Sequence, residues 1–153
     1  MWGRRVFITV LFVLVVLALA NVFGQAMTTS SASSSQATIR IEAPSALRGG
    51  LLYQVVFTVT ARTALSNPVL QLSNGWFSGL TLNAEVPQPS GQFSRLGGPA
   101  FTLGAMRPGQ QQTVRMYFQV NPTTVAWRRS VDAELYDGQT LLVTVHRTMT
   151  VYP

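Results

Sequence analysis

The residues that could do chemistry are few in this sequence. There is one histidine, His146, and no cysteine, so disulfides and thiolate metal sites are excluded. Asp132 and Glu134 stand two positions apart, which would place both carboxylates on one face of a strand. Such a pair is the minimum for a weak calcium site, but no third acid or glycine-turn loop accompanies it, so a solvated sheet face explains it better. The acids in full are Glu42, Glu85, Asp132, Glu134 and Asp137.

Motifs of known catalytic chemistry are absent from the sequence. It contains no G-x-S-x-G, Walker loop, H-E-x-x-H or glycine-rich dinucleotide fingerprint. His146 stands beside Arg147 with no nucleophile in a recognisable arrangement. We therefore expect a non-enzymatic protein without a cofactor, a metal or a small-molecule substrate. Nucleic acid is not an expected partner either, because the arginines are not interleaved with aromatic residues along a face.

Two adjacent aromatic residues suggest a contact surface. The stretch SNGWFSGLT places Trp76 beside Phe77 in a predicted loop between Gly75 and Gly79. If exposed, the pair would form an aromatic tip that docks on a partner. If buried, Trp76 would cap the end of a sandwich, with Phe77 packed beneath it. The sequence leaves both interpretations open.

Two further segments combine aromatic rings with arginine. VPQPSGQFSRLGGPAF is predicted to be a long loop, and long loops in compact domains are often functional. VAWRRS offers a ring to bury and guanidinium groups for carboxylates or lipid phosphate, although its tryptophan could also close a barrel end. The predicted partner-binding residues are Trp76, Phe77, Phe93, Arg95, Trp127, Arg128 and Arg129.

Strands are the elements that must position these residues. Apolar and polar residues alternate in runs such as TVRMYFQV at residues 113–120, the pattern of half-buried strands. Turn residues separate the runs, and Asp137-Gly138 between two of them is a type I′ hairpin signal. About seven to eight short antiparallel strands over residues 37–153, with no helical period, predict an all-β sandwich.

This region resembles the immunoglobulin-like modules of bacterial surface proteins, of the adhesion-related and conserved-repeat kinds. The resemblance is carried by APSALRGGLLYQVVFTVTA, by FTLGAMRPGQQQTVRMYFQV with its Pro-Gly corner at Leu103–Thr113, and by VDAELYDGQTLLVTVHRTMTV. It implies an immunoglobulin-like β-sandwich and no particular activity. The Cys…Trp…Cys arrangement of antibody domains is absent.

The N-terminal segment predicts a membrane anchor. Val6–Phe23 carries no charge, and about 20 apolar residues span a bilayer core. Arg4 and Arg5 precede the run and Trp2 lies before them, which favours a cytoplasmic N-terminus and a periplasmic or extracellular C-terminal part. We therefore predict a single transmembrane helix, a signal anchor, over residues 6–26.

The same segment also fits a cleaved signal peptide, because ALA at Ala18–Ala20 and GQA at Gly24–Ala26 are small-x-small cleavage sites. In the anchored interpretation, Trp2, Arg4 and Arg5 fix the helix at the interface, and Ala18, Ala20 and Gly24 permit close helix contact. MTTSSASSSQ then predicts a flexible linker. The predicted units are the cytoplasmic residues 1–5, the helix 6–26, the Ser/Thr-rich linker 27–36 and the immunoglobulin-like domain 37–153.

Two functions fit this organisation. The first is an accessory or scaffold subunit of an integral membrane complex, of the transport, respiratory or photosynthetic kind. Its partners would be the lipid bilayer and integral membrane subunits, and its sandwich would cover their outer face. The alternative is a secreted or surface binding module that loses its signal peptide and recognises a glycan, a peptide or a wall polymer.

Overall fold

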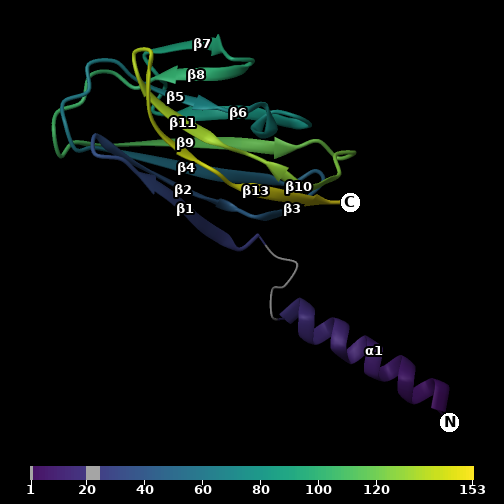
Figure 1. Cartoon of the computed structure of the whole chain (residues 1–153). Helices are drawn as coiled ribbons and strands as arrows, with labels where there is room; N and C mark the ends of the chain where they lie inside the picture. The colour runs from purple at the N-terminus through teal and green to yellow at the C-terminus, as the bar shows by residue number, and fades with distance from the viewer. Residues whose placement is uncertain (1, 20–24) are drawn as a thin grey trace.

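The computed structural model describes residues 2–19 and 25–153, and the remaining residues lie outside the described part of the chain. One N-terminal helix is followed by thirteen strands arranged as a β-sandwich (Figure 1). The elements are α1 (Trp2–Leu19), β1 (Met27–Ser33), β2 (Ala37–Pro44), β3 (Ala46–Arg48), β4 (Leu52–Ala61), β5 (Pro68–Leu72), the 3-10 helix η1 (Asn74–Trp76), β6 (Leu80–Val86), β7 (Gly91–Arg95), β8 (Gly98–Thr102), β9 (Gln111–Val120), β10 (Ala126–Ser130), β11 (Ala133–Asp137), β12 (Thr140–Val145) and β13 (Thr148–Tyr152).

Three sheets make up the sandwich. One five-stranded sheet has the order β1-β2-β4-β9-β6 and the other has the order β12-β11-β5-β8-β7. A three-stranded sheet, β10-β13-β3, adds the single parallel pair among the described strands, between β13 and β3. The edges of the two large sheets are therefore β1 and β6 in the first, and β12 and β7 in the second.

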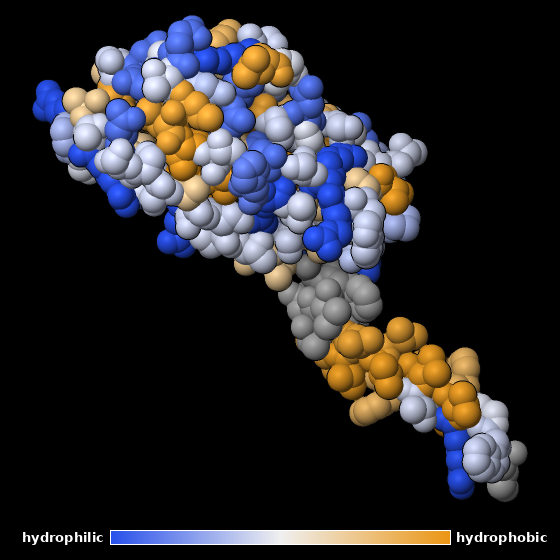
Figure 2. All heavy atoms as spheres, viewed as in Figure 1, coloured by the Kyte–Doolittle hydropathy of each residue, from blue (hydrophilic) through white to orange (hydrophobic). Residues whose placement is uncertain are grey.

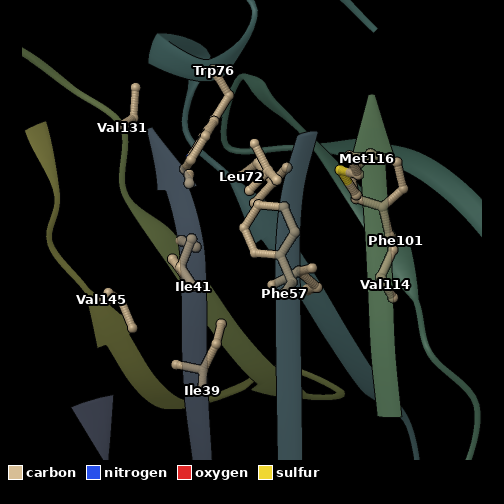
Figure 3. Close-up of a cluster of buried hydrophobic side chains, with 14 of the residues drawn as sticks. Ile39, Ile41, Phe57, Leu72, Trp76, Phe101, Val114, Met116, Val131 and Val145 are labelled. Atoms are coloured by element: carbon tan, nitrogen blue, oxygen red, sulfur yellow. The ribbon is translucent and has the colours of Figure 1, made fainter. Parts of the chain in front are cut away.

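The core lies between the two five-stranded sheets, and strand alternation fills it. In β4, Val55, Phe57 and Val59 are buried while the residues between them are half-exposed. Leu70 and Leu72 of β5, in the other sheet, belong to the same buried cluster. Figure 3 shows Leu72 with Phe57 in this cluster. Each such side chain contributes about 1.5–3 kcal/mol when it leaves water. The all-β prediction is confirmed, but β2 to β13 make twelve strands within residues 37–153 where seven to eight were predicted.

The predicted turns are partly confirmed. β11 and β12 form the expected hairpin, with Asp137 paired to Thr140, but of the two loop residues only Gly138 has a positive φ, of 59°. A type I′ turn needs positive φ at both positions, so this turn has the type II′ pattern. The type I′ pattern occurs instead at Leu96 and Gly97, with φ of 48° and 80°.

The turn at Leu96 overturns the prediction of a long loop. It joins β7 to β8, with Arg95 paired to Gly98, so a hairpin occupies most of that segment. The sequence does not reveal this strand, because β7 has no buried face and its residues therefore show no alternation of apolar and polar types. Glycine, serine and proline in and around GQFSR are also typical of loops.

The predicted flexible linker at 27–36 is also wrong. Met27–Ser33 forms β1, which pairs antiparallel with β2 from Met27 opposite Pro44 to Ser33 opposite Thr38. Its serines and threonines give no apolar alternation, because most of the strand is exposed at the edge of its sheet. The sandwich therefore begins at β1 and not at residue 37.

A buried arginine holds β1 in place. The Arg147 side chain, only 7 % exposed, donates to the Thr28 carbonyl at 3.2 Å and to Ser30 Oγ at 3.1 Å. The same guanidinium donates to the Ala43 carbonyl of β2. Burial lowers the pKa of Arg147, and carbonyl and hydroxyl oxygens take the place of an acidic partner. Hydrogen bonds to a charged donor are worth about 1.5–3 kcal/mol each.

The prediction of a transmembrane anchor is wrong. Within residues 2–19 and 25–153, no helix is long and apolar enough to cross a membrane. The first positions of α1 are Trp2, Gly3, Arg4 and Arg5, which leaves Val6–Leu19 as its apolar part.

Only some of the residues predicted to anchor the helix are described by the structure. Trp2, Arg4 and Arg5 lie at the start of α1 with exposed side chains. The positions of Ala20 and Gly24 lie outside the described residues, and so does the side chain of Ala18. Apolar side chains cover most of the visible surface of α1 except its hydrophilic N-terminal end, whereas the sandwich presents a mixed and largely hydrophilic surface (Figure 2).

We predict that Arg147→Met loosens β1 selectively. Losing the charged hydrogen bonds should lower the local opening free energy of Met27–Ser33 by about 2 kcal/mol, roughly a thirtyfold faster amide exchange. Hydrogen–deuterium exchange measured by mass spectrometry reads this segment directly. Arg40→Met is the matched control, because Arg40 is exposed on β2 opposite Ser31. Equal protection of β1 in both variants would contradict the assignment.

Candidate interaction surface

Trp76 belongs to the core, and its prediction as a partner contact is wrong. Its side chain is 0 % exposed, and its ring lies 5.5 Å from Phe57 and 6.2 Å from Phe118 between centroids. The indole Nε1 donates a hydrogen bond to the carbonyl of Asp132 at 3.0 Å. Figure 3 shows the side chain pointing from its loop into the buried cluster. The capping interpretation is therefore the correct one for this residue.

The local sequence explains why Trp76 can reach the core. A Cβ atom at Gly75 would collide with the carbonyl oxygen of Ser130, so only glycine lets the η1 turn approach β10 this closely. Phe77, the next residue, is half-buried, and its ring stands edge-to-face on Phe118 at 5.7 Å. Phe77 thus keeps a partly open side, which Trp76 does not.

Arg95 serves to join two hairpins. Its guanidinium lies 4.0 Å above the ring centroid of Tyr136, a cation–π contact. It also donates to the carbonyl of Gly138 at 2.9 Å and to Oε1 of Gln139 at 3.1 Å. Arg95 therefore clamps the β7–β8 hairpin onto the β11–β12 turn. Phe93 on the edge strand β7 remains 43 % exposed.

Trp127 is the most exposed of the predicted aromatic residues. It is 74 % exposed, and its ring meets Tyr152 of β13 edge-to-face at 6.3 Å and 76°. The register between β10 and β13 shifts between Ala126 and Arg129, so Trp127 lies in a β-bulge. Bulges re-aim side chains, which explains how Trp127 turns outward while its strand stays paired.

Hydrogen bonds of Arg128 and Arg129 stabilise the bulge. Arg128 has a φ of 47°, in the left-handed region that few non-glycine residues adopt. Its backbone N–H donates to Oγ1 of Thr150 at 3.3 Å, and the Arg129 guanidinium donates to the carbonyl of Ser78. Arg129 is thus engaged within the fold, whereas the Arg128 side chain is exposed.

Strand pairing adds two residues that the sequence analysis missed. Tyr152 is 39 % exposed, and the parallel register of β13 and β3 pairs it with the exposed Arg48. No local signal could have found them, because β13 pairs with β10 and with β3, and both strands lie outside any short sequence window around Tyr152. We call the set Trp127, Arg128, Tyr152 and Arg48 the Trp127 surface.

The acids that suggested a metal site have structural roles. Asp132 accepts hydrogen bonds from the Arg147 backbone N–H at 3.1 Å and from Ser130 Oγ at 2.8 Å, and His146 Nδ1 lies 3.5 Å from its carboxylate. Within residues 2–19 and 25–153, no group of three or more His, Cys, Asp or Glu residues could hold a metal ion.

Glu134, the second acid of the predicted pair, accepts a hydrogen bond from the Tyr136 hydroxyl at 2.7 Å. This hydrogen bond is the main cause that raises the pKa of Tyr136, and burial and the negative charge of Glu134 act in the same direction. Both carboxylates of the pair are thus engaged by neighbouring residues, as expected for a structural sheet face.

Comparisons with known proteins give only distant likenesses. No family model and no curated protein matches the chain. One similar structure is AvmM, which catalyses macrocyclization in alchivemycin A biosynthesis, with 10 % identity, a TM-score of 0.44 and coverage of 85 % of this chain and 92 % of that one. Another is Spo0M, a sporulation control protein from Bacillus subtilis, with 14 % identity, a TM-score of 0.44 and coverage of 80 % and 51 %. The chain thus matches about half the length of Spo0M.

The two tryptophans give opposite predictions for stability. Trp76→Ala removes a fully buried ring and should cost about 3–5 kcal/mol of unfolding free energy. Trp127→Ala removes an exposed ring and should change it by less than about 0.5 kcal/mol. Urea unfolding followed by circular dichroism measures both. Similar midpoints for the two variants would mean that one of the placements is wrong.

Proposed function

We propose that this protein is a non-enzymatic binding module whose Trp127 surface docks on an acidic patch of a partner protein. The observation that carries the proposal is Trp127 itself, 74 % exposed and braced by Tyr152. A large aromatic ring held at the surface loses little conformational freedom on binding and offers much apolar area. Tryptophan, tyrosine and arginine are the residues most often found at binding hot spots.

The charge of the surface sets the kind of partner. Arg48 and Arg128 are exposed beside the two rings, and their guanidinium groups match the bidentate geometry of carboxylates. Without Arg4 and Arg5 of α1, nine arginines (11 minus two) and five acids give a formal net charge of +4, which favours approach to a negatively charged surface. On an acidic patch of a protein, the arginines can bind carboxylates while the two rings pack against the protein surface.

We further propose that the sandwich works outside the cytoplasm and that α1 is an export signal removed in the mature protein. Arg4 and Arg5 supply the basic start of such a signal, and an uncharged apolar run follows them up to the small-x-small site at Ala18–Ala20. The side chains from Trp2 to Val16 are exposed, as expected for a segment that is not part of the folded domain.

A charge-matched pair of variants tests the docking surface. We predict that Trp127→Ala combined with Arg128→Ala weakens binding to immobilised poly-L-glutamate about thirtyfold, because two hot-spot side chains are worth about 2 kcal/mol or more. The control combines Leu141→Ala with Arg107→Ala, both exposed and lying outside the Trp127 surface, with the same loss of charge. Surface plasmon resonance measures both affinities at one salt concentration.

The control decides between a specific surface and general basicity. An equal loss of affinity in the two double variants would show that net charge alone attracts the polyanion, and the Trp127 surface would be discarded. Circular dichroism of both variants must show the native β spectrum, which the exposed positions of the residues lead us to expect.

The export proposal has its own measurement. We predict that protein recovered from the producing cell begins after Ala20 or after Ala26, the two small-x-small sites. Intact mass spectrometry gives the answer directly. A mass that retains Trp2–Leu19 in all of the folded protein would contradict removal of the helix.

A further inference from the structure

A groove lies on the side of the sandwich opposite β1, between the edge strands of the two facing sheets. β6 ends one five-stranded sheet and β7 ends the other, and the space between them has a volume of about 520 Å³. Ligand sites commonly have volumes of about 300–1,000 Å³. Its apolar lining comes from Phe77, Leu82 and Pro99. Phe77 rests on Phe118 and is half-buried, so its ring is fixed from below.

The polar lining of the groove consists of amides and one carboxylate. Asn83 and Glu85 come from β6, Gln88 from the segment after it, and Gln92 from β7. The three amides are exposed, and each side chain can donate and accept hydrogen bonds. This mixture suits a ligand whose own groups both donate and accept.

Glu85 supplies an acceptor that the fold leaves unused. Its Oε2 atom is buried and has no hydrogen-bond partner among the described residues. A buried polar group without a hydrogen bond is unfavourable, and a charged one more so. Burial raises the pKa of the Glu85 carboxyl, since removal from water disfavours the charged form. The Glu85 carboxyl group thus lines the groove while no described residue engages its Oε2 atom.

The charge of the lining excludes anions as ligands. No arginine, lysine or histidine lines the groove, and its one ionisable residue is Glu85. Phosphate, sulfate and carboxylate groups would meet a like charge without a compensating cation. The groove therefore suits a neutral ligand that is rich in hydrogen-bond donors.

The shape of β6 disfavours an extended peptide. The register between β6 and β9 shifts between Leu82 and Ala84, which places Asn83 in a bulge. A bulge bends and twists an edge strand, and this is one way in which edges avoid pairing with another strand. The free edge of β6 is thus unsuited to a continuous added strand, and a compact ligand is favoured.

From these features we propose that the groove between β6 and β7 binds a neutral saccharide. The Glu85 carboxylate accepts hydrogen bonds from ring hydroxyls, the amides of Asn83, Gln88 and Gln92 bond the remaining hydroxyls, and Phe77 underlies the apolar face of a sugar ring. This site is distinct from the Trp127 surface and does not depend on the function proposed for it.

The experiment uses the full chain and three defined probes, maltotriose, cellotriose and chitotriose. Isothermal titration calorimetry is expected to show saturable binding of at least one of them. Glu85→Gln and Gln92→Ala should each weaken that binding about tenfold. The matched control is Glu42→Gln, because Glu42 lies on β2, at a distance from the groove and paired with Arg40. Its affinity should equal that of the unaltered protein.

A second readout locates the ligand. Side-chain amide signals of Asn83, Gln88 and Gln92 in nuclear magnetic resonance spectra should shift with the probe, and Trp127→Ala should leave these shifts unchanged. Three results would overturn the proposal: no saturable binding of any of the three probes, equal binding by Glu85→Gln and Glu42→Gln, or binding of the diamine putrescine with no saccharide binding. The last would identify Glu85 as part of a cation site instead.

Discussion

The carbonyl and amide groups of Asp132 connect the parts of the sandwich that are far apart in the chain. Its carbonyl oxygen accepts hydrogen bonds from the Trp76 indole and from the Ser73 backbone N–H, both at 3.0 Å. Its own N–H donates to Ser73 Oγ at 3.0 Å, and its carboxylate accepts from the Arg147 N–H at 3.1 Å. One residue thus fixes the η1 turn, the entry to β11 and the break between β12 and β13. Because Trp76 is buried, its indole N–H needs this partner.

The hydrogen bonds around Asp132 also connect the elements that form the edge at β1, the groove and the Trp127 surface. Arg147 follows the end of β12, and its guanidinium reaches across to β1, so the first strand is tied to the C-terminal part of the chain. On the other side, the η1 turn that carries Trp76 continues into Phe77 and Ser78. Ser78 accepts a hydrogen bond from Arg129, which belongs to the bulged strand β10. The loop that fills the core with Trp76 therefore supports both the floor of the groove, through Phe77, and the bulge that turns Trp127 outward.

The strands that could be predicted from the sequence are those in which buried apolar residues alternate with exposed polar ones. β4 and β9 have one buried and one exposed face, and their alternation identifies them without a structure. β1 and β7 have mostly exposed side chains and are polar, so nothing in their composition distinguishes them from a linker or a loop. The sequence also predicts the N-terminal helix, but within residues 2–19 and 25–153 no helix is long and apolar enough to cross a membrane.

The candidate surface was only partly predictable for a related reason. Trp76 stands between Gly75 and Phe77, and Trp127 between Ala126 and Arg128, and neither setting tells the buried ring from the exposed one. The distinction depends on Gly75, which permits close approach to Ser130, and on the register shift in β10. Tyr152 and Arg48 join Trp127 only through the pairing of β13 with its two neighbours. Pairing between segments that are distant in the sequence cannot be predicted from a short window of residues.

Backbone strain separates the Trp127 surface from ordinary exposed loops. Among the described non-glycine residues, only Leu96 and Arg128 have positive φ. Leu96 lies at the tip of a two-residue hairpin, where a type I′ turn requires that conformation. Arg128 lies within a paired strand, where a regular ladder would have avoided a cost of about 1–3 kcal/mol. The strain persists because Arg129 and Ser130 resume pairing with β13 and Arg129 bonds Ser78. A regular β10 would alternate its side chains without interruption and lose the bulge that presents Trp127 against Tyr152, so the strained residue and the exposed ring belong to the same feature.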